Sequence, residues 1–593
     1  MTAPPRRRAA DFDLDKTKHL ASYGGFVLEG YEPVRDAFLQ NFEEDGQENS
    51  AQVCAYVRGV KVVDLWASRD HSWYGHDSLQ NVFSSSKVLS SLVVAMLVDR
   101  GHMAYEDKVA KYWPEFAQNG KQDTTIAMLM RHEAGLAKLS TKINVLDLTT
   151  EAISRGAVSD ILAAQKPMHP PGKARVYHAI SRGWFVNEVV RRCDPQHRTI
   201  GQIIRDDIAR PIGHADELVV GVPDRLQRKI AGLKAKTATW TLRQAALPRF
   251  LGGGKLVGAG WRTRLAISLG VPMYQAVKVA AQLAVAWKSR FGWSSSADTD
   301  DSGRGASNTG LNAILSGEWA MNLRLPLVTP KPIGSAEVVQ DAADRAEIAR
   351  IRALAHATFK RLDRNNDGRI DNVELAAALS DLAEESGTDP LNEKEFFQLL
   401  DSNHDGVIDE EEFVDYSTKR QNLRATFNRR CVRRAELPSA NAHCSAQAMA
   451  AAAYAMVNGG VAPCGHRLMS PEGVASAVSN SNKKILLGIP LSFTNCGVCD
   501  WGRLRHGYVG WLGIGGSVMQ WHPEEKIGFA YAMDTMEIIP WNARGYLLQE
   551  VVLKCARQAA ATDHVEADTG AETPSDQSPS IRSRLLCVDY ISS

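Results

Sequence analysis

Ser84 and Lys87 are the residues of this chain whose types and spacing best suit nucleophilic catalysis. Residues i and i+3 share one face of a helix, so a helix that begins here would place the lysine amine beside the serine hydroxyl. A hydroxyl is a weak nucleophile until a base takes its proton, and a lysine can be that base only if burial or a second cation lowers its pKa. About two Ser-x-x-Lys matches are expected by chance in a chain of this length. Taken alone, the motif is better explained as a serine-rich helix cap with a solvated lysine.

Two other stretches carry oxygen-bearing side chains at regular places. Calcium takes six to eight oxygen ligands, and each stretch offers Asp or Asn at alternate positions, a glycine for the sharp turn and a closing glutamate. The candidate ligands are Asp363, Asn365, Asp367, the Arg369 carbonyl, Asp371 and Glu374, followed by Asp401, Asn403, Asp405, the Val407 carbonyl, Asp409 and Glu412. The pattern resembles a pair of EF-hand loops, with Ile370 and Ile408 placed where paired loops join through a short strand contact. It predicts two bound calcium ions and leaves open whether they serve sensing or buffering.

The elements that must position Ser84 lie on either side of it. Residues 52–57 and 60–65 read as strands around the turn Arg58–Gly59, which predicts a β-hairpin. Residues 83–100 are mostly apolar or small and are followed by Gly101, a common helix stop. We therefore expect a buried helix that begins at the serine.

Length and charge limit the classes of function. The chain has 593 residues, 44% apolar and 23% charged, which is ordinary globular composition and predicts about two to four domains. The formal net charge of +1 argues against a nucleic-acid-binding protein. Nine cysteines without a visible disulfide framework favour a reducing compartment, and no apolar run follows the N-terminal arginines as in a signal peptide. We expect a cytoplasmic protein without an organic cofactor; a mitochondrial transit peptide remains open.

The near-neutral total hides two blocks of opposite charge. Residues 225–297 contain thirteen Lys or Arg, no Asp or Glu, and four tryptophans, whereas residues 336–416 contain 21 acidic and 8 basic residues. Three interpretations of the basic block remain open: a lid over the active site, a peripheral contact with an anionic membrane, or an intramolecular contact with the acidic calcium-binding pair. The last would let calcium move the block relative to the active site.

Six further segments occur in a characteristic order. They are VVDLWASRD at 62–70, VFSSSKVLSS at 82–91, KYWPEFAQNGKQDTTIAMLMRHEAGL at 111–136, VYHAISRGWFVNEVVRR at 176–192, AELPSANAHCSAQAMAAAAYAMVNGG at 435–460 and GWLGIGGSVMQWHPEEKIGFAYAMD at 510–534. Together they resemble the serine β-lactamase-like superfamily, in particular its esterase branch, the family VIII carboxylesterases. The resemblance covers roughly residues 25–240 and 425–556.

The resemblance implies a role for each residue at a matching position. Ser84 would be the acylated nucleophile and Lys87 its helical partner, while Tyr177 would point at the serine and share proton transfer. The backbone N–H groups of Ser84 and Ile514 would form the oxyanion hole. The residues that the resemblance assigns to substrate binding are Trp511, Gly513 and His178.

Two positions depart from the family pattern. Ala179 stands where an asparagine is usual, and Trp511 stands where Lys or His usually offers a cation to a substrate carboxylate. Penicillins and peptidoglycan stems carry that carboxylate, so we expect a small-molecule ester as substrate. Two alternatives stay open: a β-lactam or peptide substrate, and an inactive scaffold whose working part is the calcium sensor.

The fold expected from the resemblance is α+β, of the β-lactamase/transpeptidase type. An antiparallel sheet would be flanked by helices, with an all-helical cluster beside it and the all-α EF-hand pair inserted before the final strands. The expected units are an N-terminal extension (1–24), the hydrolase domain in two parts (25–334 and 425–558), the EF-hand pair (335–420) and a disordered tail (559–593).

Overall fold

A computed structural model gives the fold of the chain. It describes residues 17–42, 48–235, 426–486, 489–536 and 543–569, and shorter pieces at 7–9, 323–324, 353, 356–357, 359–377, 397, 406–411 and 413. Most of the basic block (236–297) and four predicted calcium ligands, Asp401, Asn403, Asp405 and Glu412, lie outside the described residues.

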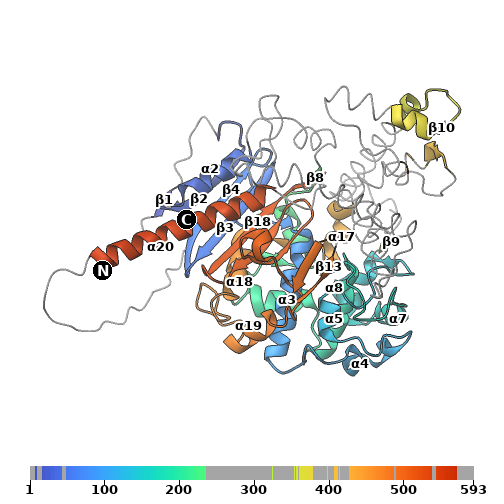
Figure 1. Ribbon diagram of the computed structural model, residues 1–593, viewed down its shortest axis with the longest axis horizontal. Coiled ribbons are helices and arrows are strands. Elements are labelled where there is room, and N and C mark those ends of the chain that lie inside the picture. The colour runs from blue at the N-terminus through green and yellow to red at the C-terminus, as the bar shows by residue number, and fades with distance from the viewer. Residues whose placement is uncertain are drawn as a thin grey trace, which may run out of the picture.

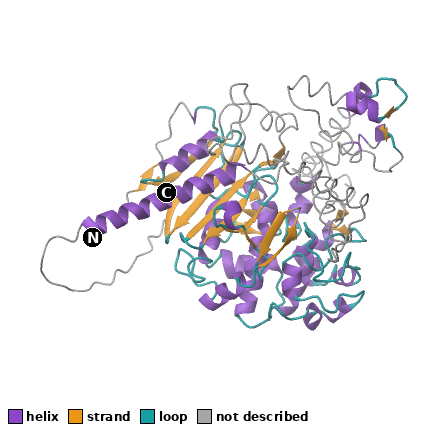
Figure 2. Ribbon diagram, in the orientation of Figure 1, coloured by secondary structure: helices purple, strands orange, loops and turns teal. Residues whose placement is uncertain are grey.

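A ten-stranded antiparallel sheet forms the centre of the molecule (Figures 1 and 2). Its strands, in spatial order, are β1 (Arg7–Ala9), β2 (Ser22–Leu28), β4 (Val60–Ser68), β3 (Ser50–Val57), β18 (Ile527–Met533), β17 (Val518–His522), β16 (Val509–Leu512), β15 (Cys499–Asp500), β14 (Ile489–Phe493) and β13 (Asn482–Leu486). β3 pairs with β18 over its full length, from Ala51↔Met533 to Val57↔Ile527. Strands from both sides of the insertion therefore build one sheet.

The predicted hairpin before Ser84 is confirmed as β3 and β4. Arg58 and Gly59 both have positive φ, 49° and 92°, as a tight two-residue hairpin turn requires. Because helices cover both faces of the sheet here and β3 lies between β4 and β18, every residue of β3 is buried.

Helices cover both faces of the sheet. On one face α2 (Glu32–Gln40) and α20 (Ala543–Thr569) lie side by side (Figure 1) and share a core with β3, β4 and β18. On the other face α18 (Ala446–Ala455), seven of whose ten residues are alanine, packs on β18 and β3. A Cβ on Gly528 of β18 would come within 2.6 Å of Tyr454 backbone atoms, so the glycine permits this close approach.

A helical cluster stands beside the sheet and shares its larger core. Its helices are α3 (Ser86–Asp99), α4 (Val109–Tyr112), α5 (Ile126–Met130), α6 (Thr150–Ser154), α7 (Ser159–Ala163), α8 (Ser181–Cys193), α9 (Ile200–Ile203) and α19 (Pro471–Val478). α3 is buried along almost its whole length and contacts α8, α19 and β16. The predicted buried helix after Ser84 is thus confirmed, and Gly101 follows it with φ 75°.

Short elements complete the frame. A small sheet joins β5 (Gln80–Asn81), β12 (His443–Cys444) and β7 (Leu218–Val219) just before the serine. The remaining described pieces are β6 (Ile143–Asn144), β8 (Lys234–Ala235), β9 (Leu323–Arg324), β10 (Arg369–Ile370), β11 (Ile408–Asp409), α17 (Arg430–Arg434) and β19 (Thr535–Met536).

The two chain ends differ from the expected units. β1 lies inside the expected N-terminal extension and forms an edge strand on β2. The expectation of a disordered tail is wrong for residues 559–569, because α20 continues to Thr569; the sequence there, QAAATDHVEADT from residue 558, holds several strong helix formers. Residues 570–593 lie outside the described residues.

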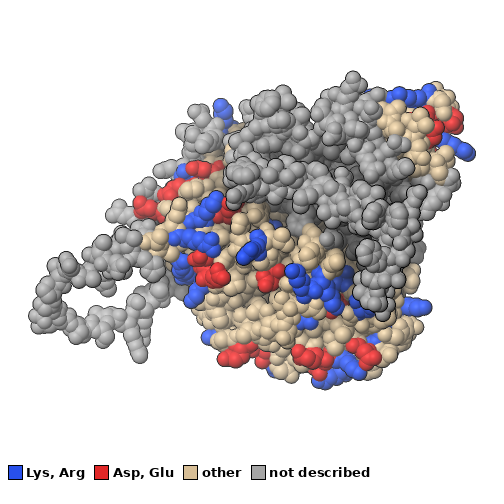
Figure 3. Space-filling model, viewed as in Figure 1, with Lys and Arg blue, Asp and Glu red and all other residues tan. Residues whose placement is uncertain are grey.

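The described surface carries both signs of charge. On the face shown in Figure 3, Lys and Arg alternate with Asp and Glu over the described elements. Among the described helices, none combines the length and apolarity needed to cross a membrane.

Candidate active site

Ser84 lies in a 3-10 turn, η1 (Phe83–Ser85), that leads directly into α3. Phe83 has φ 41°, a left-handed conformation that is costly for a bulky residue. The turn is held by the Asn81 side chain, which accepts a hydrogen bond from the Phe83 amide at 2.8 Å, and by Ser86 Oγ, which donates to the Phe83 carbonyl. Between residues 78 and 97, all of them described, Ser84 is the one residue that is not buried. The strained turn therefore presents one hydroxyl at the surface of a buried segment.

Lys87 is buried beneath that hydroxyl. Its Nζ lies 3.3 Å from Ser84 Oγ and donates hydrogen bonds to the carbonyls of Ala179 at 2.6 Å and Ser439 at 2.9 Å. Burial, and secondly the charge of Arg182, hold the pKa of Lys87 well below its usual value. A neutral amine has two N–H donors and one lone pair. With both donors directed at carbonyl oxygens, the lone pair is left for the Ser84 hydroxyl.

Tyr177 approaches Ser84 from the loop before α8. Its hydroxyl donates to Ser84 Oγ at 2.8 Å, and its oxygen accepts a hydrogen bond from Trp511 Nε1 at 3.2 Å. Lys87 Nζ also lies 4.8 Å from the centre of the Tyr177 ring. Burial raises the pKa of Tyr177, so the group facing the serine is a protonated phenol. The predicted proximity of Ser84, Lys87 and Tyr177 is confirmed.

The turn after β16 is hydrogen-bonded to the turn that contains Ser84. Ser517 Oγ donates to the Val82 carbonyl at 2.6 Å and lies 3.1 Å from Ser85 Oγ. A Cβ on Gly513 would sit 2.4 Å from the Val82 oxygen, so only glycine fits there. Gly513 is thus a packing residue, and Ile514, the next residue, is held beside the Ser84 turn.

Trp511, which the resemblance assigns to substrate binding, contacts the catalytic tyrosine candidate directly. It is 6% exposed, stacks among Trp501, Phe493 and Tyr177 with ring centres 5.2–5.9 Å apart, and directs its indole N–H at the Tyr177 oxygen. A cation at this position would face a substrate carboxylate, whereas the indole fixes the orientation of the tyrosine hydroxyl.

The assignment of His178 to substrate binding is wrong. The ring is fully buried, its Nε2 accepts the Leu136 amide at 2.9 Å, and its Nδ1 lies 2.6 Å from the Val176 carbonyl. Burial lowers the pKa of His178 to about 3, so it is neutral and both nitrogens are occupied. Adjacent residues in an extended segment point to opposite sides, and with Tyr177 directed at Ser84 its neighbour supports the loop behind it.

Three further residues contribute to the site without a motif that reveals them. Ala179 and Ser439 act only through their backbone carbonyls, and carbonyls carry no side-chain signal. Arg182, which is 1% exposed, influences Lys87 through its charge. Its signal in the sequence is a lone arginine on an otherwise apolar helical face.

The first calcium loop is described in full. Asp363 accepts hydrogen bonds from the amides of Asp367 at 3.1 Å and Gly368 at 2.9 Å, and Glu374 accepts from the Arg364 amide at 2.8 Å. Gly368 has φ 80°, as the sharp turn requires. The donors are oxygen atoms throughout, which fits a hard cation. Among the described residues no group of three carboxylate, His or Cys side chains is arranged around a metal position.

The pairing of the two loops is confirmed. β10 and β11 are antiparallel, with Ile370 opposite Ile408, and both isoleucines are fully buried. They share a small core with Phe359, Leu375, Phe397 and Phe413. Of the second loop's predicted ligands, Val407 and Asp409 belong to the described part of the chain.

Comparison with known proteins agrees with this geometry. Residues 35–307 match the family model described as Beta-lactamase, and residues 352–418 match the EF-hand domain pair. The chain carries a beta-lactamase domain and an EF-hand pair.

The beta-lactamase domain has relatives of two kinds. The chain is 34% identical over 177 residues to "Esterase/beta-lactamase LipL" of Mycobacterium tuberculosis, a match that spans 29% of this chain and 39% of that protein. The structure superimposes on "Crystal structure of a family VIII carboxylesterase" with a TM-score of 0.53 and 21% identity, covering 90% of this chain and 100% of that one. This likeness confirms the α+β fold of the β-lactamase type.

The EF-hand pair has a separate relative. It is 34% identical over 83 residues to "Probable calcium-binding protein CML28" of Arabidopsis thaliana, 14% of this chain and 88% of that protein.

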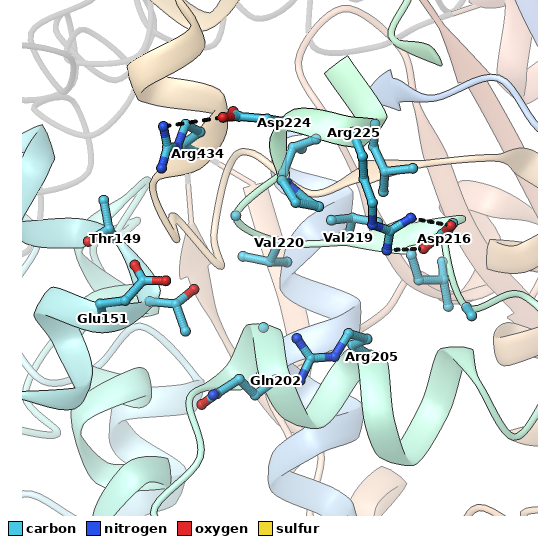
Figure 4. A pocket seen from close by; sticks show the side chains of 18 of the residues that line it. Thr149, Glu151, Gln202, Arg205, Asp216, Val219, Val220, Asp224, Arg225 and Arg434 are labelled. Atoms are coloured by element: carbon cyan, nitrogen blue, oxygen red, sulfur yellow. Dashed lines mark hydrogen bonds and ion pairs between the residues drawn. The ribbon is translucent and has the colours of Figure 1, made fainter. Parts of the chain in front are cut away.

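A hollow in the beta-lactamase domain lies away from Ser84. It has a volume of about 460 Å³ and is lined by residues 149–151, parts of α9, the loop 215–226 and Arg434 (Figure 4). Ser84, Lys87, Tyr177 and Trp511 do not line it. Two of its charged residues pair with each other, because Arg225 donates two hydrogen bonds to Asp216, of 2.5 and 2.6 Å. We assign it no ligand.

Proposed function

We propose that this protein is a serine hydrolase that cleaves a small ester through an acyl-enzyme on Ser84. One observation carries the proposal: Ser84 Oγ lies 3.3 Å from Lys87 Nζ, an amine whose pKa is lowered by burial, and 2.8 Å from the hydroxyl of Tyr177, a phenol whose pKa is raised by burial. A base and an acid on opposite sides of one hydroxyl are what acyl transfer to serine needs.

The acylation step follows from these contacts. The Ser84 proton passes to the Lys87 lone pair as Oγ attacks the ester carbonyl carbon. The negative charge that develops on the carbonyl oxygen is held by the amides of Ser84 and Ile514. As the tetrahedral intermediate collapses, Tyr177 gives its proton to the leaving alkoxide and recovers one from the Lys87 ammonium. Water then attacks the acyl-enzyme by the reverse sequence and restores Ser84, Lys87 and Tyr177.

An ester is the substrate class that the surroundings favour. The packing around Tyr177 is aromatic and uncharged, because Trp511 contacts Tyr177, and Trp501 and Phe493 contact Trp511. Trp511 offers no cation for a substrate carboxylate, and its one N–H already bonds Tyr177. The name of the relative LipL includes both esterase and beta-lactamase. The rates of hydrolysis of an ester and of a β-lactam should therefore be compared.

Labelling and hydrolysis test the proposal together. Wild type should react with a fluorophosphonate and hydrolyse p-nitrophenyl esters, and Ser84→Ala should do neither. Ser90→Ala is the matched control, because Ser90 is a buried serine of the same helix whose hydroxyl bonds only the Lys87 carbonyl, at 3.0 Å. Unlabelled wild type would show an inactive scaffold, and faster turnover of nitrocefin than of every ester would show a β-lactamase.

We further propose that the EF-hand pair binds two calcium ions and that calcium acts on the active site. The residues on either side of the insertion 236–425 meet at a neck formed by Leu233, Phe427 and Asn428. The Asn428 side chain accepts from the Leu233 amide at 2.9 Å and donates to the Leu233 carbonyl at 3.0 Å. Phe427 packs on Phe83, the residue before the nucleophile, with ring centres 5.2 Å apart.

The Leu233 side of the neck leads to the turn after β16, which contains Ile514. β8, which follows Leu233, pairs with β19, and a Cβ on Gly515 would lie 3.3 Å from the Met536 Cα of β19. A change transmitted along either side of the insertion therefore arrives beside Ser84 or beside Ile514. Calorimetry should find two calcium ions per chain, and ester hydrolysis should differ between calcium and chelator. Equal rates in the two conditions would remove the regulatory part and leave the hydrolase.

A further inference from the structure

Arg182 is a buried cation that lacks an opposite charge. Its side chain, on the first turn of α8, donates to Ser91 Oγ at 2.7 Å and to the Gly497 carbonyl at 3.4 Å. Among the described residues it forms no ion pair, and its Nε–H has no acceptor. Of the three other buried arginines among the described residues, Arg175 and Arg544 each contact a carboxylate, Glu133 and Glu48 respectively, whereas Arg505 bonds the neutral Gln549 side chain far from Lys87. A charge buried without a partner is costly, so its presence beside a catalytic centre needs a reason.

The position of Arg182 relates it to Lys87. Ser91, its hydrogen-bond partner, follows Lys87 by four residues in α3, so both lie on the same face of that helix, one turn apart. The carbonyl of Ala179, in the same segment as Arg182, holds the Lys87 amine. Two groups from this segment therefore contact one face of α3. The Ala179 carbonyl accepts from Lys87, and the Arg182 guanidinium donates to Ser91, one helical turn further along.

The other titratable groups around Lys87 are uncharged. Tyr177 faces it as a phenol, and burial with the Arg182 charge keeps the pKa of His132 and of His178 below the usual value. Arg182 is the one charge that acts on Lys87 among the described residues, and it lowers the pKa of the amine. The guanidinium of Arg182 is therefore the described cation whose charge acts on the Lys87 amine.

We propose that Arg182 is a positioning residue whose fixed positive charge keeps Lys87 in the free-amine form that can take the Ser84 proton. This rests on the proposed acyl transfer at Ser84. The same repulsion acts after the proton has moved: the Lys87 ammonium lies close to a second cation, which favours passing the proton on through Tyr177 to the leaving alkoxide. The proton taken from Ser84 leaves with the alcohol, and no other reactant is required.

The test is the pH profile of Ser84 reactivity in charge-removing variants. Arg182→Gln keeps a donor for Ser91 but removes the charge, and Arg182→Met removes both. Rates of fluorophosphonate labelling and kcat/KM for a p-nitrophenyl ester would be measured from about pH 5 to pH 10. In both variants the pH at which the labelling rate and kcat/KM rise (the acid limb of the profile) should increase by about one unit, because the pKa of Lys87 rises when the arginine charge is removed. Both rates should therefore fall roughly tenfold at pH values below this rise and should equal those of wild type on the alkaline plateau.

A matched control separates charge at Lys87 from loss of a buried arginine. Arg505 is 4% exposed and hydrogen bonds to the neutral Gln549 side chain at 2.6 Å, under α20. Arg505→Met should keep the wild-type acid limb. A loss in Arg182→Gln that is equal at every pH, an unmoved limb, or unfolding of both Arg182 variants at the assay temperature would overturn the proposal. Wild type that is unreactive at every pH would refute the hydrolase function itself, and this inference with it.

Discussion

Replacing Tyr177 by phenylalanine separates its role as an acid from its role in packing. The ring keeps its contacts with Trp511, His132 and Lys87, with ring centres 5.9 and 4.9 Å apart and the lysine 4.8 Å away. What disappears is the hydroxyl 2.8 Å from Ser84 Oγ, the group that protonates the leaving alkoxide in our account. General acid catalysis contributes roughly 10²- to 10⁴-fold, so kcat/KM for an ethyl ester should fall by about that factor.

The leaving group decides how much of this loss appears. p-Nitrophenolate is stable as an anion and needs no proton, so its ester should lose less than about tenfold in Tyr177→Phe. The Trp511 N–H also loses its acceptor, and an unsatisfied buried donor costs about 1–3 kcal/mol of folding free energy, which urea unfolding would measure.

The assay compares kcat/KM for ethyl and p-nitrophenyl esters of one acid in wild type, Tyr177→Phe and Tyr508→Phe. Tyr508 is also fully buried, and its hydroxyl bonds the Gln549 carbonyl at 3.4 Å on the α20 side of the sheet, so both rates should persist there. Equal losses for the two esters in Tyr177→Phe would refute the role of Tyr177 as the acid, and an unchanged ethyl ester rate would refute its participation.

Three further results are expected. Lys87→Arg, which keeps a cation that cannot lose its proton, should reduce kcat/KM at least about 100-fold at every pH. Wild-type kcat/KM should rise with pH as the Lys87 amine, whose pKa is lowered, gives up its proton. Substantial activity in Lys87→Arg would contradict the role of Lys87 as the base. Asn428→Ala should leave calcium binding by calorimetry intact but reduce the difference in ester hydrolysis between calcium and chelator, and an undiminished calcium effect would exclude the neck as the route. Glu133→Gln should destabilise the fold by about 3–5 kcal/mol in urea, because it leaves Arg175, paired with it at 2.6 Å and fully buried, without a counter-charge; a loss below about 1 kcal/mol, the range of an exposed ion pair, would contradict this.

Much of the frame could be predicted because the signals are local. The turn Arg58–Gly59 between two alternating runs specifies the β3–β4 hairpin, and the apolar run closed by Gly101 specifies α3. The calcium loop follows from ligand spacing alone, and so does the contact of Ile370 with Ile408. Such features need only neighbouring residues to be correct.

The site could be predicted only as far as side-chain motifs extend. The two carbonyls that hold Lys87 come from residues 92 and 352 positions away, and a carbonyl belongs to every residue. Trp511 was assigned to substrate binding, yet its hydrogen bond to Tyr177 depends on how two distant elements meet. His178 follows a residue that faces Ser84, and its own direction was set by the loop around Leu136 and Val176. α20 extended past its expected end because helix propensity outweighed a polar composition.

The central claim is that the acyl group of an ester is transferred to Ser84, and mass spectrometry of the stopped reaction tests it most directly. Wild type mixed with a p-nitrophenyl ester, quenched in acid within the first turnover and digested, should yield the peptide containing residues 83–87 heavier by one acyl group, with the added mass on Ser84. An adduct on another residue, or steady hydrolysis with no acylated peptide at any quench time, would contradict the account.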